Sequence, residues 1–278
     1  MALLSMNEVT TYRWSFEEDV RNYAAAGIDG ISVWRQKLSD FGEEKGAELL
    51  AESGLAVSAL LWVGGFTGSD GRSYRDSVQD AVEAVQLAGQ LKAHSLIVYS
   101  GARAGHTHNH ARRLFKNALK ELTDVACEHG VALAIKPMHV GCAGEWTFLS
   151  RLDETLELIQ PLDCPQLKLA FDVYHLGQEP GVLERLVEII PWIAIVQLGD
   201  AKHPPHGEQN RCRLGEGRLP LKEIVTTLVE ADYRGFFDIE LMGEDLENSD
   251  YKELLAHSQR AFATLLGERG ASAQCRLL

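Results

Sequence analysis

Short apolar runs rich in β-branched residues alternate with longer amphipathic stretches along almost the whole chain. The runs have the length of strands, while the stretches have helical spacing and begin or end at residues such as Ser15 and Gly27. The predicted strands lie at 2–6, 30–34, 56–62, 95–100, 132–136, 167–172, 194–198 and 236–241. The predicted helices lie at 15–27, 43–53, 74–91, 109–129, 152–159, 181–190, 221–231 and 252–266.

This alternation predicts parallel strands joined by crossover helices, because continuous apolar strands must be covered on both faces. Eight strand–helix units in a chain of 278 residues favour a single closed (β/α)8 TIM barrel. The alternative is an open, doubly wound sheet, but no GxGxxG turn follows the first run, and residues 64–69 match that motif poorly. We predict one barrel domain over residues 1–268 and an unpatterned C-terminal tail over 269–278.

The charge of the chain argues against nucleic acids and membranes as partners. Asp and Glu number 40 against 27 Lys and Arg, a net charge of -13 that repels phosphate backbones and acidic lipids. No apolar stretch approaches the roughly 18 residues of a membrane span, and the first residues lack a signal-peptide pattern. The five cysteines include no CxxC pair, which is typical of reduced thiols, so we expect a cytoplasmic protein.

Polar and aromatic side chains stand at the ends of several predicted strands. In a closed barrel the C-terminal strand ends converge at one mouth, where an active site is built. A charged side chain that ends an apolar strand needs a partner or a solvated cavity. The side chains at or just beyond these ends include Trp34, Trp62, Lys136, Asp172, His175, Gln197 and Glu240. We therefore expect a ligand or metal site at this mouth.

Three motifs close the sixth, seventh and eighth predicted strands: AFDVYHLGQEP, IVQLGDAKHPPHGEQNRCRLGEG and ADYRGFFDIELMG. In this order they resemble the Asp-x-x-His segment, the His-(Leu/Ile)-x-Asp segment with its later Arg and Gly-Glu-Gly, and the Glu-ended eighth strand of the xylose-isomerase-like sugar isomerase and epimerase barrels. The resemblance is specific from about residue 130 to 243. It implies a barrel that acts on a small polyhydroxylated substrate, and by analogy a possible homo-oligomer.

The resemblance also implies a divalent cation, Mn²⁺, Mg²⁺ or Co²⁺, held by a Glu, an Asp, a His and a Glu at the ends of strands five to eight. By position the Asp is Asp172, the last Glu is Glu240, and Gln197 replaces the His with an amide oxygen that can bind a hard cation. Lys136 stands at the first Glu position, and an ammonium has no lone pair for a metal. We therefore expect the metal site to be weakened or absent.

In such barrels the metal would chelate a ketose through a carbonyl and an adjacent hydroxyl, with two Glu on opposite faces of the carbon that loses its proton. Lys136 leaves three arrangements open. It could pair with Asp172 and Glu240 and itself stabilise an enolate oxygen, or His139 or Glu145 could supply the missing group. In the third arrangement the barrel only binds a sugar. A Schiff base at Lys136 is disfavoured, because neighbouring carboxylates raise the pKa of the amine.

The resemblance assigns further residues. His175 matches a His that faces the substrate or lies just behind the residues that contact it, and we count it with Glu240 and Lys136 as catalytic candidates. Arg213, just before Gly-Glu-Gly, matches an Arg that contacts substrate oxygens, with Arg211 as the near alternative. The remaining candidates for substrate binding are Trp34, Trp62 and Glu145, with Trp146 and Phe66 as further parts of an apolar wall.

Four other features receive simpler interpretations. We expect Glu8 to be a solvated surface residue and Asp200 to hold its loop. The HTHNH segment at 106–110 reads as a helix start rather than a metal cluster. The glycine-rich segment 64–72 could form a lid over the mouth.

The expected function is isomerisation or epimerisation of a ketose or sugar derivative by proton transfer next to a carbonyl. Two alternatives remain open from the sequence. One is a dehydroshikimate dehydratase-like lyase of the same superfamily, which begins with a similar proton removal. The other is a non-catalytic sugar-binding barrel, which is motivated by Lys136.

Overall fold

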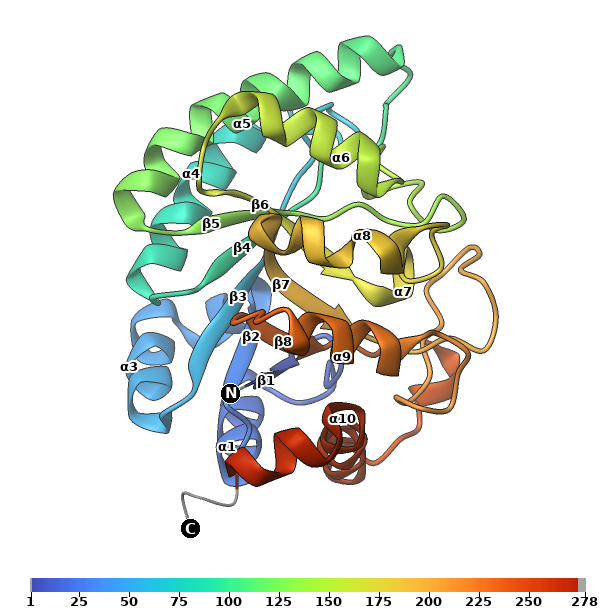
Figure 1. Ribbon diagram of the computed structural model, residues 1–278. Helices are drawn as coiled ribbons and strands as arrows, with labels where there is room; N and C mark the ends of the chain where they lie inside the picture. The colour runs from blue at the N-terminus through green and yellow to red at the C-terminus, as the bar shows by residue number, and fades with distance from the viewer. Residues whose placement is uncertain (1, 275–278) are drawn as a thin grey trace.

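The computed structural model describes residues 2–274 and shows a closed barrel of eight parallel strands surrounded by helices (Figure 1). Neighbouring strands pair in chain order, and β1 also pairs with β8, which closes the barrel. The predicted single (β/α)8 barrel is confirmed. The strands are β1 (Leu3–Asn7), β2 (Gly30–Trp34), β3 (Ala56–Val63), β4 (Ser95–Val98), β5 (Ala132–Ile135), β6 (Leu167–Asp172), β7 (Ile193–Leu198) and β8 (Phe236–Ile239).

The helices cover the outside of the barrel (Figure 1). The α-helices are α1 (Phe16–Ala25), α2 (Arg35–Phe41), α3 (Glu43–Ser53), α4 (Tyr74–Gln90), α5 (His108–His129), α6 (Leu152–Ile159), α7 (Val173–Leu176), α8 (Val182–Ile189), α9 (Leu221–Glu230) and α10 (Tyr251–Gln274). Three 3-10 helices, η1 (Gln160–Leu162), η2 (Ile190–Trp192) and η3 (Glu244–Leu246), complete the set of described helices.

Two of these helices, α2 and α7, were not predicted. The chain leaves β2 directly into α2, and Gly42, at φ 104°, separates α2 from α3. Helix α7 follows β6 without a loop, because the Asp172 side chain accepts a hydrogen bond from the backbone N–H of Tyr174 and caps the helix. Asp172 therefore ends a strand and begins a helix at the same position.

The division of the chain at residue 268 stays a prediction. Helix α10 is described as far as Gln274, but Gly267 inside it has φ 68°, which is outside the helical range. The helical course is thus interrupted next to the predicted boundary. Residues 275–278 of the predicted tail lie outside the described residues.

The strand register places polar side chains at one level of the barrel. Asp172 of β6 lies opposite Gln197 of β7, and Gln197 lies opposite Asp238 of β8. Asp238 in turn lies opposite Ser5 of β1. Because side chains alternate along a strand, Glu240 faces the same side as Asp238, two residues nearer the mouth. The fold therefore brings these groups together from strands far apart in the sequence.

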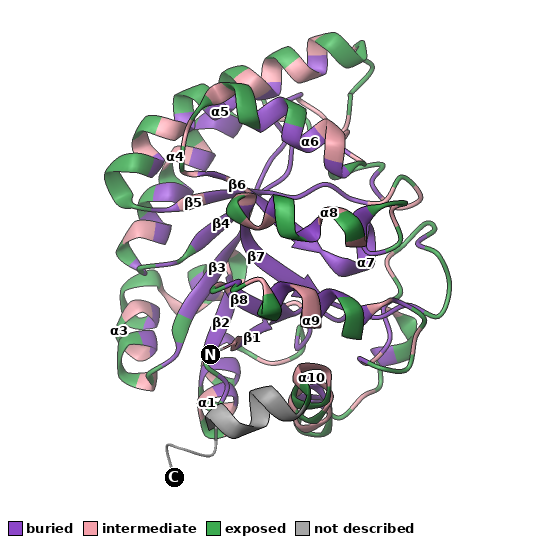
Figure 2. Ribbon diagram, viewed as in Figure 1, coloured by how far each residue is buried: buried purple, intermediate pink, exposed green. Residues whose placement is uncertain are grey.

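The apolar core has two parts, one on each side of the barrel wall. Buried residues such as Val33 and Ile135 belong to the larger cluster, which also contains the buried helix residues. A smaller cluster contains the small side chains Ala134 and Ala170 together with Phe236. The strands are almost entirely buried, while the helices expose their outer faces (Figure 2). This packing leaves only the strand ends for chemistry.

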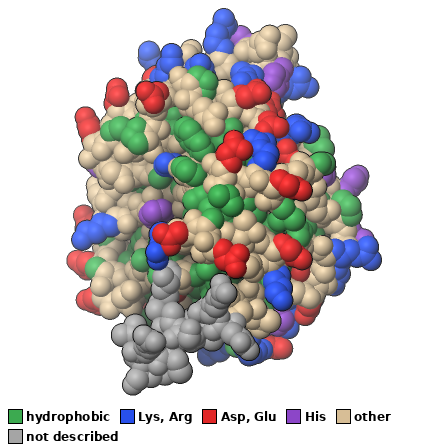
Figure 3. All heavy atoms as spheres, in the orientation of Figure 1, with side chains coloured by type: hydrophobic (Ala, Val, Ile, Leu, Met, Phe, Trp, Pro, Cys, Tyr) green, Lys and Arg blue, Asp and Glu red, His purple; other side chains and the backbone are tan. Residues whose placement is uncertain are grey.

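The surface carries charges of both signs. Acidic and basic side chains are interspersed on the face shown in Figure 3. Among residues 2–274, none of the helices combines the length and the apolar character that a membrane crossing requires.

The first helix begins at the predicted capping box. The Ser15 hydroxyl accepts a hydrogen bond from the Glu18 backbone N–H, and the Glu18 carboxylate accepts one from the Ser15 N–H at 2.8 Å. The two residues thus satisfy backbone donors that a helix start leaves unpaired.

We predict that Ser15→Ala lowers the free energy of unfolding by about 1 kcal/mol, because this cap is lost. Urea denaturation followed by circular dichroism measures the change. Ser39→Ala, at an exposed helical position, serves as the matched control and should change the value by less. Equal losses in both variants would contradict the role of the cap.

Candidate active site

Four predicted residues meet at the C-terminal end of the barrel. Lys136 follows β5, Asp172 ends β6, Gln197 lies in β7 and Glu240 follows β8. The exposed fraction is 1% for Lys136, 0% for Asp172 and 4% for Glu240. Arg211, from the loop after β7, joins them and is fully buried. Lys136, Asp172, Arg211 and Glu240 are called the ion cluster below.

The Lys136 ammonium lies between the two carboxylates of the ion cluster. Its Nζ is 2.9 Å from Asp172 Oδ2 and 2.8 Å from Glu240 Oε1. Burial by itself disfavours the ammonium, but the charges of Asp172 and Glu240 outweigh it and raise the pKa of Lys136 above its ordinary value. Lys136 therefore stays protonated, and its expected pairing with Asp172 and Glu240 is observed. Its role toward an enolate oxygen stays a prediction.

Arg211 is the second cation between the same carboxylates. One guanidinium nitrogen, Nη2, is 2.8 Å from Asp172 Oδ2 and 2.9 Å from Glu240 Oε1. The guanidinium also lies 4.6 Å from the centre of the Tyr174 ring. Burial would raise the pKa of Asp172, but Arg211 and Lys136 hold it well below its usual range. Two cations thus balance two carboxylates in a space closed to bulk water.

The structure brings Arg211, not Arg213, to the ion cluster. The nearest acidic partner of Arg213 is Glu253 of α10, at 3.5 Å. The loop that follows Arg213 is held by Asp200, which accepts hydrogen bonds from the backbone N–H groups of Gly215 and Gly217 at 2.9 and 3.0 Å. Asp200 therefore holds its loop as predicted. The spacing to Gly-Glu-Gly did not tell the two arginines apart, because both precede that motif closely.

A polar layer lies beneath Glu240. Asn7 Nδ2 donates to Asp238 Oδ2 at 3.0 Å and to Glu240 Oε2 at 3.2 Å. Gln197 Nε2 also donates to Glu240 Oε2, and Ser5 donates to Asp238 at 2.7 Å. Burial raises the pKa of Asp238 to about 6. Asp238 was not predicted, although its place two residues before Glu240 puts both on one face of the strand.

His175 lies beside the ion cluster and is fully enclosed. Its Nε2 is 3.8 Å from Asp172 Oδ2 and 3.4 Å from Arg211 Nη2, and its Nδ1 is 3.6 Å from Cys142 Sγ. Burial lowers the pKa of His175 well below its ordinary value, which keeps the imidazole neutral. His175 thus lies against Asp172 and Arg211, and its catalytic role stays a prediction.

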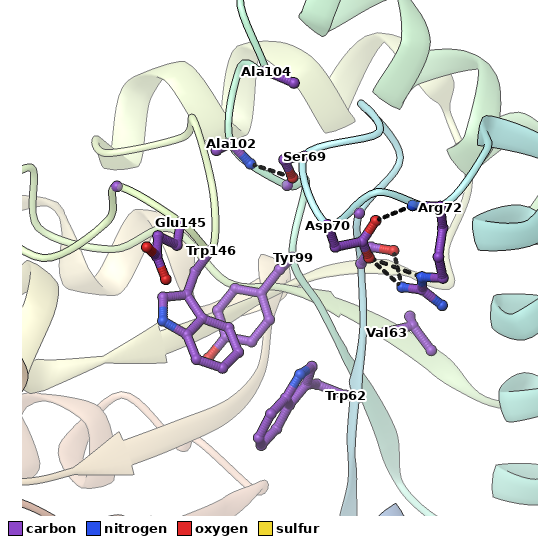
Figure 4. A pocket seen from close by; sticks show the side chains of 14 residues that line it. Trp62, Val63, Ser69, Asp70, Arg72, Tyr99, Ala102, Ala104, Glu145 and Trp146 are labelled. Carbon is purple, nitrogen blue, oxygen red and sulfur yellow. Dashed lines mark hydrogen bonds and ion pairs between the residues drawn. The ribbon is translucent and has the colours of Figure 1, made fainter.

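Aromatic side chains form one wall of the mouth. The rings of Trp34 and Trp62 are stacked with centres 6.1 Å apart. The Trp146 ring lies 5.2 Å from that of Trp62 and 5.3 Å from that of Tyr99. Figure 4 shows Trp62, Tyr99 and Trp146 grouped together. These residues come from β2, from β3, and from the segments that follow β4 and β5.

Several cavities meet at this wall, and two of them share three of its rings. A cavity of about 100 Å³ is lined by Lys136, Glu240, Trp62, Tyr99 and Trp146, among other residues. A larger pocket of about 570 Å³ shares the three aromatic residues with it (Figure 4). The ion cluster therefore has a small cavity next to it, and that cavity adjoins a larger one.

Glu145 is exposed at the edge of the larger pocket, separate from the ion cluster.

Two residues lie elsewhere than expected. Phe66 is fully buried and packs against Phe115 with ring centres 5.7 Å apart, so it is not part of the wall. Glu8 is fully buried rather than solvated. Its carboxylate accepts a hydrogen bond from the Trp34 N–H at 2.6 Å, which partly compensates for the loss of water.

The histidine-rich segment 106–110, expected to begin a helix, and the glycine-rich segment 64–72, expected as a lid, both lie near the mouth-side loops. Thr107 caps α5, as predicted from HTHNH. Two hydrogen bonds hold the glycine-rich segment 64–72. The Ala102 N–H of the next loop donates to Ser69 Oγ at 3.1 Å, and within the segment Arg72 donates to the Gly64 carbonyl at 3.0 Å. The structure thus shows this segment in contact with the loop after β4.

The closed barrel and the buried polar groups at its C-terminal strand ends are typical of TIM barrels whose sites lie at this end of the barrel. A family model described as "Xylose isomerase-like TIM barrel" matches residues 20–262, and the chain belongs to this family.

Two relatives are similar over much of this chain. Hydroxypyruvate isomerase of Escherichia coli (strain K12) is 25% identical over 169 residues, which cover 60% of this chain and 61% of that protein. A putative hydroxypyruvate isomerase of Danio rerio is 23% identical over 240 residues, 81% of this chain and 83% of that protein.

The fold also matches solved structures. A crystal structure of a protein from Sinorhizobium meliloti 1021 superposes with a TM-score of 0.86 at 24% identity, covering 93% of this chain and 96% of that chain. At this level of identity the similarity shows the fold alone.

We predict that Lys136→Met lowers the free energy of unfolding by about 3–5 kcal/mol, because it leaves two buried carboxylates with one cation. Chemical denaturation measures the loss. Lys120→Met, an exposed position on α5, is the matched control and should be close to neutral. A Lys136→Met protein as stable as the control would show that the ion pair is not needed to balance the cluster.

Proposed function

We propose that this chain is a sugar isomerase or epimerase that transfers a proton next to a carbonyl group, with an internal ammonium in place of a metal ion. The observation that carries the proposal is the contact between Lys136 and Glu240 at the wall of the small cavity, 2.8 Å between Nζ and Oε1. Glu240, as a proton acceptor, and the positively charged Lys136 thus line the same small cavity. The two hydroxypyruvate isomerases among the relatives support an enzyme of this kind.

The residues present do not fit the divalent cation that the family resemblance implies. Lys136 Nζ occupies the space between Asp172 and Glu240, the two carboxylates that would bind it. Arg211 contacts the same two carboxylates, so their charge is already balanced. A dication there would face two fixed cations at close range. We therefore infer an altered site in which Lys136 and Gln197 replace metal ligands.

The proposed reaction begins with an α-hydroxycarbonyl compound in the small cavity. As the substrate enters, its carbonyl oxygen takes a hydrogen bond from Lys136 that Glu240 Oε1 had accepted. Oε1 then keeps its contact with Arg211 and turns the lone pair that Lys136 has left toward the adjacent carbon. Glu240 then removes the proton from the adjacent carbon, and the electron pair of the broken C–H bond forms an enediolate whose oxygen is stabilised by the ammonium. Lys136 remains protonated throughout, because its pKa is raised.

The second half of the reaction returns the proton. Protonated Glu240 delivers it to the former carbonyl carbon, while the hydroxyl proton passes to the former carbonyl oxygen, so that the carbonyl group moves by one carbon. A single carboxylate can serve both carbons on one face of a planar enediolate. Epimerisation requires a second group that returns the proton to the opposite face, whereas Lys136 bonds the carbonyl oxygen in the proposed reaction and keeps its proton. The site therefore favours isomerisation over epimerisation.

We expect the protein to exchange carbon-bound protons of a ketose or of hydroxypyruvate for deuterium in D₂O. Glu240→Gln should slow the exchange by about 10²–10⁴-fold, because an amide cannot accept the proton. Proton NMR measures the rate, and Glu244→Gln, an exposed residue of η3, is the matched control. Exchange by Glu240→Gln at the wild-type rate would overturn the role of Glu240.

We further predict that Mn²⁺ does not stabilise the wild-type protein, whereas it raises the melting temperature of Lys136→Glu by roughly 5 °C at saturation. The substitution returns a carboxylate to the position and removes the ammonium. Thermal unfolding with and without Mn²⁺ measures the shift, with Lys120→Glu as the exposed control. Equal stabilisation of wild type and variant would favour a metal site of Asp172, Gln197 and Glu240.

One observation favours a second candidate, a non-catalytic sugar-binding barrel. The Glu240 carboxylate accepts hydrogen bonds from Lys136, Gln197 and Asn7 and contacts Arg211, so its lone pairs are engaged. A ligand that leaves these contacts in place would bind without reaction. Binding without any deuterium exchange would support this candidate, and loss of water from dehydroshikimate in the same NMR experiment would support the lyase.

A further inference from the structure

The larger pocket, which adjoins the small cavity at the aromatic wall, is not needed for a three-carbon substrate. The small cavity of about 100 Å³ already contains the groups of the proposed reaction, Lys136 and Glu240. The pocket of about 570 Å³ adds a space of ordinary ligand-binding size. Trp62, Tyr99 and Trp146 line both, so a molecule that reaches from one to the other passes over these rings.

The charges that line the larger pocket exclude an anionic group. Arg72 is its one cation among the described residues, and Asp70 and Asp80 lie 2.7 and 2.9 Å from the guanidinium. Arg72 also donates to the Gly64 carbonyl at 3.0 Å, so few of its donors remain for a ligand. Glu145, at the edge of the pocket, adds a negative charge. A phosphate or carboxylate would find no free cation among these residues.

Among the described residues that line the small cavity, no cation is free for such a group either. Lys136 is engaged by Asp172 and Glu240, and one of its contacts has to serve the reacting carbonyl in the proposed reaction. Arg211 is tied to the same two carboxylates. A substrate with a phosphate would therefore bring an unpaired charge into a largely closed space.

The aromatic wall favours a neutral ring. Trp146 is 38% exposed, and its ring stands at 76° to that of Trp62, so the two offer faces in different directions (Figure 4). A pyranose ring has an apolar face that packs on an aromatic ring, while its hydroxyl groups stay in contact with water or backbone. Ser69 lies on the wall of the pocket as a polar neighbour.

From these observations we propose that the larger pocket is a subsite for an uncharged glycosyl group, so that the substrate is a keto-disaccharide or a related glycoside rather than a sugar phosphate or a free triose. This inference rests on the proposed function, because it takes the ion cluster as the place of the reacting carbonyl. The reacting ketose unit lies against Lys136 and Glu240, and the second ring lies against Trp62 and Trp146.

Isothermal titration calorimetry of the full chain tests the subsite with four probes: isomaltulose, turanose, fructose and fructose 6-phosphate. At least one of the two keto-disaccharides should bind about tenfold more tightly than fructose, and fructose 6-phosphate should bind no more tightly than fructose. Trp146→Ala should weaken the disaccharide about tenfold and fructose by clearly less, because Trp146 also lines the small cavity. Val140→Ala, 76% exposed in the same loop, is the control and should change neither.

Three outcomes would overturn the subsite: no binding of either disaccharide, tighter binding of fructose 6-phosphate than of the disaccharides, or an equal loss for fructose and disaccharide in Trp146→Ala. The last would place Trp146 against the reacting sugar itself. Deuterium exchange separates this inference from the proposed function. Disaccharide binding that depends on Trp146 without exchange refutes the isomerase and keeps the subsite, whereas exchange on fructose without a disaccharide preference does the reverse.

Discussion

The balance of two cations against two buried carboxylates organises the mouth of this barrel. Lys136 and Arg211 each contact both Asp172 and Glu240, and all four side chains are removed from bulk water. Any one of these charges alone would be expensive to bury, so each is retained because the others are present. The loop after β7 depends on this balance, because its residue Arg211 completes the cluster.

The same balance sets the chemistry that the site can support. A fixed positive charge beside a carboxylate can stabilise an enolate, because an enolate carries negative charge on the oxygen next to the carbon that loses a proton. With its cations already paired, the site offers little to an anionic substituent. The aromatic wall of Trp62, Tyr99 and Trp146 then gives the adjoining pocket its character. The paired cations and the aromatic wall together favour neutral polyhydroxylated compounds as ligands.

The sequence allowed the barrel and most of the ion cluster to be predicted, because apolar periodicity marks strands and a charged residue at a strand end is conspicuous. It did not separate Arg211 from Arg213, since loop geometry decides which guanidinium points inward. Asp238 was overlooked because its strand appeared apolar, and Glu8 was taken for a surface residue. Both are buried through partners distant in sequence, Ser5 and Asn7 for Asp238 and the Trp34 backbone for Glu8.

By itself the sequence determined the eightfold alternation, and with it a parallel barrel with its polar strand ends at one mouth, because local periodicity and the covering of both strand faces leave few other folds. The tertiary structure alone decided which of these groups touch. Strand register sets Asp172, Gln197 and Asp238 at one level, and ring closure brings Asn7 of β1 to Glu240 beyond β8. Contacts between such distant residues depend on the closed barrel and are encoded in no local pattern.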